Sequence, residues 1–205
     1  MTTTSALDRW IAAGAVASVA AVVSVVTGGV ATAQTAKQPH HASEPMPKLA
    51  QSGSLSAADR KFVEQAAMGG VAEAEAGRLA QQKAGNDSVT QYAARIVEDH
   101  DNANTELRQI ATAKSVTLPN APDAVHQAEM KRLETMTGPQ FDREFTRMMV
   151  RDHETVVAAF DKQAKSGSDP ELKAFAAKTL PTLRTHLQMA KQVQTRAGAA
   201  SAASR

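Results

Sequence analysis

Apolar side chains recur every three or four positions along most of the chain, a spacing that places them on one face of an α-helix. The pattern defines four long helical segments, which we predict over residues 56–84, 87–114, 139–165 and 169–196. Each segment carries charged residues on its opposite face, as a helix at the surface of a globular protein does. The pattern therefore predicts four amphipathic helices that bury their apolar faces together.

Short turn sequences divide these segments into two pairs. Gly85-Asn86 separates the first two segments and Ser166-Gly167-Ser168 the last two, so each pair must fold as an antiparallel hairpin. The connection between the pairs is longer and contains a short helix, predicted over about 123–136. We therefore predict one all-α domain over residues 56–196, an antiparallel four-helix bundle with a short crossover helix.

The first 33 residues differ in composition from the bundle. A polar start precedes an apolar run over residues 10–26, and the small residues Ala31-Thr32-Ala33 follow it. This order is typical of an export signal, for which we predict cleavage before Gln34, and the apolar run could also serve as an uncleaved membrane anchor. In both cases we expect the rest of the chain outside the cytoplasm, in the periplasm or associated with the cell envelope.

Two further segments flank the predicted bundle. Residues 34–55 contain several proline, serine and glutamine residues and are predicted to form a flexible linker. Residues 197–205 consist mainly of alanine and serine and are predicted to form a disordered tail. Association with the envelope is expected through the N-terminal segment, and the sequence indicates no particular protein partner.

Composition supports the all-α interpretation and excludes several kinds of partner and site. Hydrophobic residues make up 42% of the 205 residues but aromatic residues only 3%, a mixture that favours helices over strands. The formal net charge is +2 and the two signs are interleaved, so we expect no nucleic-acid partner. The absence of cysteine excludes disulfides, thiolate nucleophiles and cysteine-ligated metals.

One polar residue interrupts the apolar face near the middle of each long helix. These four residues are Glu73, His100, Asp152 and His186. Because a buried carboxylate is normally paired or bound to a metal, four such residues at one level predict a core site for one divalent transition-metal ion. Their nitrogen and oxygen donors suit Fe, Mn, Zn or Cu.

Two neighbouring residues extend this set. Asp152 and His153 lie on the two flanks of the same apolar face, and either one could point inward. We assign Asp152 as a ligand and expect Asp99 and His153 to surround the site, each holding an imidazole by its other nitrogen.

The same residues also permit an interpretation without a metal. Glu73 with His100, and Asp152 with His186, could form two buried polar pairs that fix the register of the helices. A further alternative is a mononuclear metal-dependent redox or stress-protection enzyme of the envelope. We expect an envelope binding or interaction module, whose core could hold one metal ion, rather than an enzyme.

The order of these residues resembles a known group of proteins. Glutamate, histidine, aspartate and histidine on successive helices look like the ferritin-like superfamily. More closely, the chain resembles an exported bacterial family called domain of unknown function 4142, whose members are often labelled outer membrane proteins. The residues that carry the resemblance are Phe62 to Ala84 with Gly69-Gly70 and Glu73, Ile96 to Leu107 with Asp99-His100, Phe141-Asp142, Asp152-His153-Glu154, Leu180-Pro181 and His186-Leu187. The resemblance covers about residues 55–194 and implies a ferritin-like bundle in the periplasm or envelope, with no established activity.

The sequence departs from di-iron ferritin-like proteins at one motif. Those proteins place Glu-x-x-His on each of two helices. Here Val97 stands three residues before His100, and Leu183 stands three residues before His186, so both bridging carboxylates are missing. This departure argues against a dinuclear oxidase site.

Overall fold

The computed structural model describes residues 54–203 of the chain. The predictions for residues 1–33, and nearly all of the predicted linker over 34–55, lie outside the described residues. The helices are α1 (Ala57–Lys83), α2 (Asp87–Ala113), α3 (Ala124–Glu134), α4 (Gly138–Ser166) and α5 (Pro170–Ala203). Apart from one isolated bridge between Ala84 and Gly138, the described part contains no β-structure, which confirms the all-α prediction.

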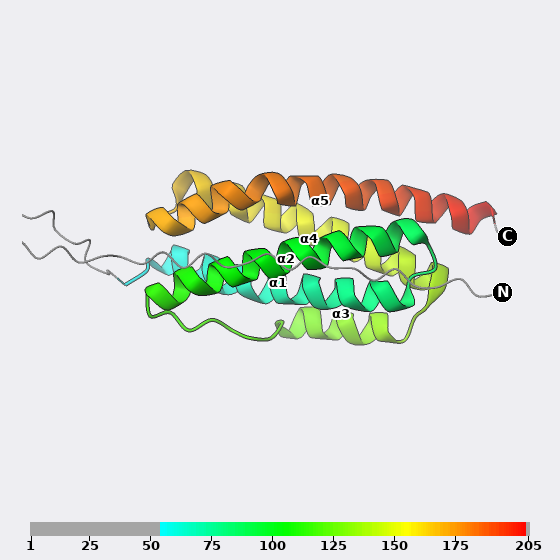
Figure 1. The fold of residues 1–205 in the computed structure, drawn as a ribbon, viewed down its shortest axis with the longest axis horizontal. Helices are drawn as coiled ribbons and strands as arrows, with labels where there is room; N and C mark the ends of the chain where they lie inside the picture. The colour runs from blue at the N-terminus through cyan, green and yellow to red at the C-terminus, as the bar shows by residue number, and fades with distance from the viewer. Residues whose placement is uncertain (1–53, 204–205) are drawn as a thin grey trace, which may run out of the picture. The chain divides into compact units, whose positions relative to one another are not determined.

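The four long helices form two antiparallel hairpins that pack side by side (Figure 1). Helix α1 packs along α2, and α4 packs along α5; across the bundle, α1 also contacts α4, and α2 contacts α5. Helix α3 lies outside the four long helices, against α1 and α4. It returns the chain along the bundle, so that α2 and α4 run in the same direction. This is the predicted antiparallel bundle with a short crossover helix.

The helix starts follow from their capping residues. The side chain of Ser56 accepts a hydrogen bond from the backbone N–H of Asp59 (3.0 Å), and Asn86 accepts one from Ser88 (2.9 Å). Asp123 caps α3 in the same way. Such side chains satisfy the N–H groups that the first turn of a helix leaves without partners. They fix the observed starts within one or two residues of the predicted ones.

A buried aspartate ties each hairpin to the turn of the other. Asp59, at the start of α1, accepts hydrogen bonds from the side chain of Gln163 (2.7 Å) and from the backbone of Ser168 and Asp169 (both 3.2 Å) in the α4–α5 turn. At the opposite end, Asp142 near the start of α4 accepts a bond from the N–H of Gly85 in the α1–α2 turn (3.0 Å). These bonds set the relative height of the two hairpins.

The last helix is longer than predicted. Helix α5 continues to Ala203, so the expected disordered tail from residue 197 is corrected for residues 197–203. Ala197 is buried against the apolar core, and the alanines around it have the highest helix propensity of all residues. No helix within residues 54–203 combines the length and apolar character that crossing a membrane requires.

The apolar core consists of two clusters with a polar layer between them. One cluster surrounds Tyr92 and Phe145 towards the α1–α2 turn, and the other surrounds Phe62 and Phe160 towards the α4–α5 turn. Along each long helix, one buried histidine or glutamate lies between the residues of the two clusters, and on α2 the buried Asn104 accompanies it. The fold therefore brings polar groups from all four helices into the middle of an otherwise apolar interior.

Candidate metal centre

The polar layer receives one buried side chain from each long helix. They are Glu73 on α1, His100 on α2, His153 on α4 and His186 on α5, with exposed fractions of 4%, 5%, 0% and 1%. Of these four residues, the sequence analysis assigned Glu73, His100 and His186 as ligands, and the structure brings those three together.

Each of the four side chains contacts at least one of the others. Glu73 Oε2 lies 3.2 Å from His100 Nε2, and Glu73 Oε1 lies 3.3 Å from His153 Nδ1. His153 Nε2 lies 3.4 Å from His186 Nδ1. One ring nitrogen from each of the three histidines lies within 4.8 Å of the others, close enough for all three to bind a single ion.

The partners of two histidines determine which nitrogen carries the proton. His153 Nδ1 lies 2.9 Å from the carbonyl oxygen of Met149, and His186 Nε2 lies 2.8 Å from Asp99 Oδ2. Both oxygens only accept, so in neutral imidazoles these two nitrogens are the donors. The remaining nitrogens, His153 Nε2 and His186 Nδ1, then face each other with lone pairs at 3.4 Å. This contact is repulsive unless a proton or a cation lies between the two nitrogens.

The electrostatic environment disfavours a proton in that position. Burial lowers the pKa of His153 and His186 to about 4, and burial together with the two neighbouring imidazoles holds the pKa of His100 well below its usual range. All three rings are therefore neutral at neutral pH, which is the protonation state in which histidine binds metals. A metal cation between the rings would satisfy the facing lone pairs.

Glu73 responds to the same burial in the opposite direction. Burial, with a further contribution from the charge of Asp152, raises the pKa of Glu73 to about 8. The carboxyl group therefore keeps its proton at neutral pH until a nearby positive charge displaces it. A divalent cation among the three imidazoles would supply that charge, and Glu73 would then contribute an anionic oxygen.

His100 adds an independent indication of a missing partner. Its Nε2 is buried and has no hydrogen-bond partner among the described residues, although Glu73 Oε2 lies 3.2 Å away. Buried nitrogens of this kind are normally satisfied, and the exceptions need an explanation. A cavity of about 30 Å³ borders His100, His186 and Glu73 and leaves room beside them.

The structure corrects the assignment of the adjacent residues Asp152 and His153. His153 is the central residue, whereas Asp152 turns towards α3 and is held by Arg151 at 2.8 and 3.0 Å. The buried positions Phe145 and Met149 are four residues apart, and four more lead to His153, which therefore continues the line of the core. The four-residue spacing from Phe145 and Met149 was the signal that could have identified His153.

Asp99 lies where the sequence analysis expected it, beside an imidazole. It accepts from His186 Nε2 and is itself paired with Arg95 at 2.6 Å, which keeps it available as an acceptor. A carboxylate that holds the outer nitrogen of a histidine fixes the ring orientation and raises the basicity of the inner nitrogen. His153, expected in that surrounding role, instead belongs to the central group.

Comparison with known proteins identifies the family. A family model described as "Domain of unknown function (DUF4142)" matches residues 44–193. The chain belongs to the DUF4142 family. The resemblance inferred from the sequence is thereby confirmed, and no curated protein matches the chain.

Solved structures share the fold of this DUF4142 protein at low sequence identity. A DUF305 fragment from Deinococcus radiodurans has a TM-score of 0.62 and 17% identity, and the match covers 69% of this chain and 98% of that one. A DUF305 protein from Streptomyces coelicolor, described as secreted, has a TM-score of 0.59 and 15% identity over 69% and 92% of the two chains. CopM in its Cu(II)-bound form has a TM-score of 0.58 and 19% identity over 67% and 96%. CopM is also known in an Ag-bound form, which has a TM-score of 0.56 and 21% identity over 67% and 96%. At these identities the similarity shows a common fold alone.

Proposed function

We propose that this DUF4142 protein is an exported metal-binding module that holds one divalent transition-metal ion in its core. The imidazoles of His100, His153 and His186 would hold the ion, and Glu73, which contacts two of these rings, would supply a carboxylate beside them. The observation that carries the proposal is the pair of lone-pair nitrogens, on His153 and His186, that face each other at 3.4 Å. No proton is expected between them at neutral pH, since both rings have a pKa of about 4.

The donor set indicates which ions fit. Three imidazole nitrogens and one carboxylate suit Cu(II), Zn(II) and Fe(II), and at an unconstrained site Cu(II) binds most tightly in the first row of transition metals. CopM, which shares the fold, has been solved with Cu(II) and with Ag bound, and this supports copper as the first ion to test. The group contains a single carboxylate, Glu73, which favours one ion over a dinuclear iron site.

Metal binding can be tested on the full chain by equilibrium titration with Cu(II) and with Zn(II). We expect one ion per chain at high affinity. The substitution His153→Gln retains an amide that can donate to Met149 but removes the inner nitrogen, and it should lower the affinity by more than about 100-fold. The matched control is His126→Ala on α3, because His126 is a histidine outside the central group.

Further controls address binding elsewhere and loss of folding. The double substitution of His40 and His41 by alanine tests whether the adjacent histidines of the N-terminal segment bind the ion. Circular dichroism of His153→Gln shows whether the helical fold persists. Unchanged affinity in a folded His153→Gln protein would contradict the proposal.

Export is proposed from the N-terminal sequence pattern, and the secreted relative from Streptomyces coelicolor supports it. Full-length protein produced in a bacterium should fractionate with the periplasm or the envelope, with a mature N-terminus near Gln34 if the segment is a cleaved signal. Intact protein with Met1 in the cytoplasmic fraction would contradict export.

A further inference from the structure

A pocket of about 450 Å³ opens between α1, α3 and α4 beside the metal centre. Its lining includes Gly69 and Glu73 of α1, His126 and Glu129 of α3, and Arg151 and Asp152 of α4. Apolar side chains, including Phe62 and Phe160, form the rest of its walls. The pocket is far larger than the cavity of about 30 Å³ beside His100 and His186.

Glu73 connects this pocket to the metal centre. Its carboxyl group contacts His100 and His153, yet the same residue lines both the outer pocket and the inner cavity. Glu73 therefore forms part of the wall between the two spaces. A cation that reaches the inner end of the pocket meets a group that belongs to the proposed site.

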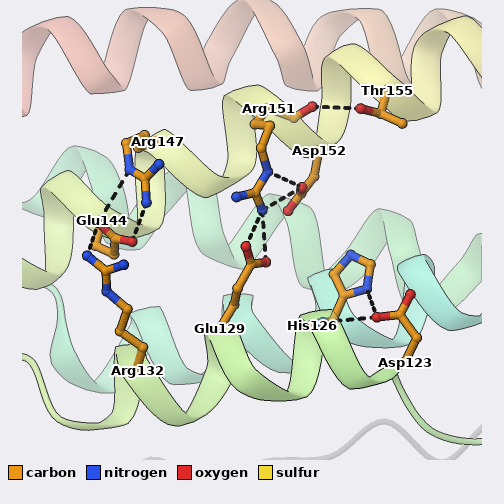
Figure 2. A network of polar contacts seen from close by, with 9 residues as sticks. All are labelled: Asp123, His126, Glu129, Arg132, Glu144, Arg147, Arg151, Asp152 and Thr155. Carbon is orange, nitrogen blue, oxygen red and sulfur yellow. Dashed lines mark hydrogen bonds and ion pairs between the residues drawn. The ribbon is translucent and has the colours of Figure 1, made fainter.

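The charges in the pocket favour a cation. Carboxylates of Asp123, Glu129 and Asp152 line it in addition to Glu73, whereas Arg151 is its one arginine or lysine. Figure 2 shows Arg151 between Glu129 and Asp152, at 2.7–2.8 Å from the first and 2.8–3.0 Å from the second. The single guanidinium of Arg151 thus pairs with two carboxylates, and the pocket keeps an excess of negative charge.

Asp152 has an oxygen that this network leaves without a partner. Arg151 contacts only Oδ1, whereas Oδ2 is buried and has no hydrogen-bond partner among the described residues. A buried carboxylate oxygen without a donor is costly, and a passing cation would relieve that cost. This oxygen and the buried carboxyl group of Glu73 in the wall could both attract a cation on its way from the pocket to the core.

We infer that the pocket between α1, α3 and α4 is the entrance through which the metal ion reaches the core. Asp152 is the anionic contact on this route, and the carboxyl group of Glu73 lies beyond it and ionises as the cation approaches. Arg151 slows entry, because its positive charge pairs with Asp152 and repels an incoming cation. The inference rests on the proposed metal site, and it assigns Asp152 a role in the rate of loading rather than in the final coordination.

A substitution that fills the pocket tests the route directly. A Cβ atom added at Gly69 meets no atom within 4 Å, so Gly69→Phe can place an aromatic ring against Phe62 and Phe160 without a backbone clash. Stopped-flow absorption with Co(II) as the probe should show loading slowed by about tenfold or more, since a blocked gate limits the rate. The Co(II) dissociation constant should stay within about twofold, because a gate slows entry and release equally.

Matched glycine substitutions control for folding and for the added ring. Gly198 on α5 also has no atom within 4 Å of an added Cβ, and it lies outside the lining of the pocket, so Gly198→Phe should load at the wild-type rate. Gly69→Ala adds one methyl group, leaves the pocket open and should also load normally. Slow loading in all three variants would overturn the inference.

Two charge substitutions provide a second test of the route, and they should change the loading rate in opposite directions. Asp152→Asn keeps the shape but removes the charge, and it should slow Co(II) loading by about tenfold. Arg151→Gln removes the positive charge and should accelerate loading by a similar factor. Both effects should shrink at high ionic strength, since salt screens exposed charges.

The outcomes separate the entrance from the site itself. Failure of the wild-type protein to bind Co(II) at equilibrium would contradict the proposed function. Normal equilibrium binding with unchanged rates in Gly69→Phe and Asp152→Asn would overturn the entrance alone. Slower loading in Thr182→Leu, at the inner cavity between α2 and α5, with normal loading in Gly69→Phe would place the entrance on the opposite side and also overturn the inference.

Discussion

Neighbouring oxygen atoms set the position of the proton on two of the three imidazoles in the core. The carbonyl of Met149 holds it on Nδ1 of His153, and the carboxylate of Asp99 holds it on Nε2 of His186. These acceptors lie on the outer side of each ring, so the free nitrogen of each ring points inward. The preference for a cation therefore originates in residues that need not touch the cation.

The first prediction concerns Asp99. Asp99→Ala removes the acceptor that orients His186, and it should weaken Cu(II) or Zn(II) binding by about 10–100-fold, as removal of such outer partners does elsewhere. Equilibrium titration measures the effect. The adjacent exposed residue Glu98 provides the control, since Glu98→Ala changes the charge equally and should leave the affinity unchanged.

The second prediction concerns the pH dependence caused by Glu73 in metal-free protein. The pKa of Glu73 is raised from an ordinary 4.5 to about 8, so between these values the folded state binds a proton that the unfolded chain has lost. The contribution of Glu73 to the free energy of unfolding is thus fully present below pH 4.5 and falls as the pH rises towards 8. Glu73→Gln has no such dependence.

Chemical denaturation at several pH values checks this expectation. The free energy of unfolding of Glu73→Gln minus that of the wild type should increase by up to about 1.4 kcal/mol per pH unit between pH 5 and 8. Above pH 8 the difference should level off. A difference that stays constant with pH would show that Glu73 is not held in its protonated form.

The sequence predicted three of the four central side chains because each is the polar exception on an apolar face. It assigned Asp152 instead of His153, because both flank the apolar face of the helix and the four-residue spacing from Phe145 and Met149 to His153 was not used. The position of Asp152 depends on α3, which packs against α4 and provides Glu129 as a partner for Arg151 beside Asp152. A contact between helices that are distant in the sequence is absent from any local pattern.

At the scale of single elements, the small residues of α1 allow α2 to approach closely. A Cβ atom added at Gly77 would lie 2.8 Å from Val97 Cγ2 and 3.1 Å from the carbonyl oxygen of Ala93. Both neighbours belong to α2, so Gly77 faces that helix. Gly69, two turns earlier on α1, faces the open pocket instead.

The third prediction contrasts these two glycines. Gly69→Ala should raise the free energy of unfolding by about 0.5–1 kcal/mol, because alanine favours the helix and meets no obstacle. Gly77→Ala gains the same propensity but forces α1 and α2 apart, and it should lower the free energy of unfolding by about 1–3 kcal/mol. Thermal or urea unfolding measures both variants, and equal effects would contradict the role assigned to Gly77.

Element boundaries were predictable where a side chain caps the helix. Ser56, Asn86 and Asp123 each carry an oxygen in the right place, and the helices begin after them. The end of α5 was not predictable in this way, because no proline or αL glycine stops it. Its length depends on the burial of Ala197 against the core, which is a property of the packed bundle.

At the scale of the whole molecule, the candidate metal centre lies where the two hairpins meet. Glu73 and His100 come from one hairpin, and His153 and His186 come from the other. The apolar clusters on either side bury the polar layer, and that burial keeps the imidazoles neutral. The position of the site at mid-bundle followed from the sequence, since the polar exceptions lie near the middle of each predicted helix.

The fourth prediction is that the ion stabilises the entire bundle. An ion that binds only the folded state adds about 2.7 kcal/mol to the free energy of unfolding at 100 times its dissociation constant. Urea denaturation with and without Zn(II) should show this gain in the wild type. The gain should vanish in His153→Gln, and a gain that survives this substitution would indicate that the ion binds elsewhere.

The buried aspartates at the two ends of the bundle have a consequence for its lifetime. Asp59 and Asp142 link the two hairpins through hydrogen bonds at the two ends of the bundle. An ion at the centre would add a third link between the hairpins, which is lost when the ion dissociates. Separation of the hairpins would then have to wait for the ion to leave, which lowers the unfolding rate as well as the equilibrium population of open chains. Proteases cleave such open chains, so the resistance of the protein to proteolysis would follow the local supply of metal.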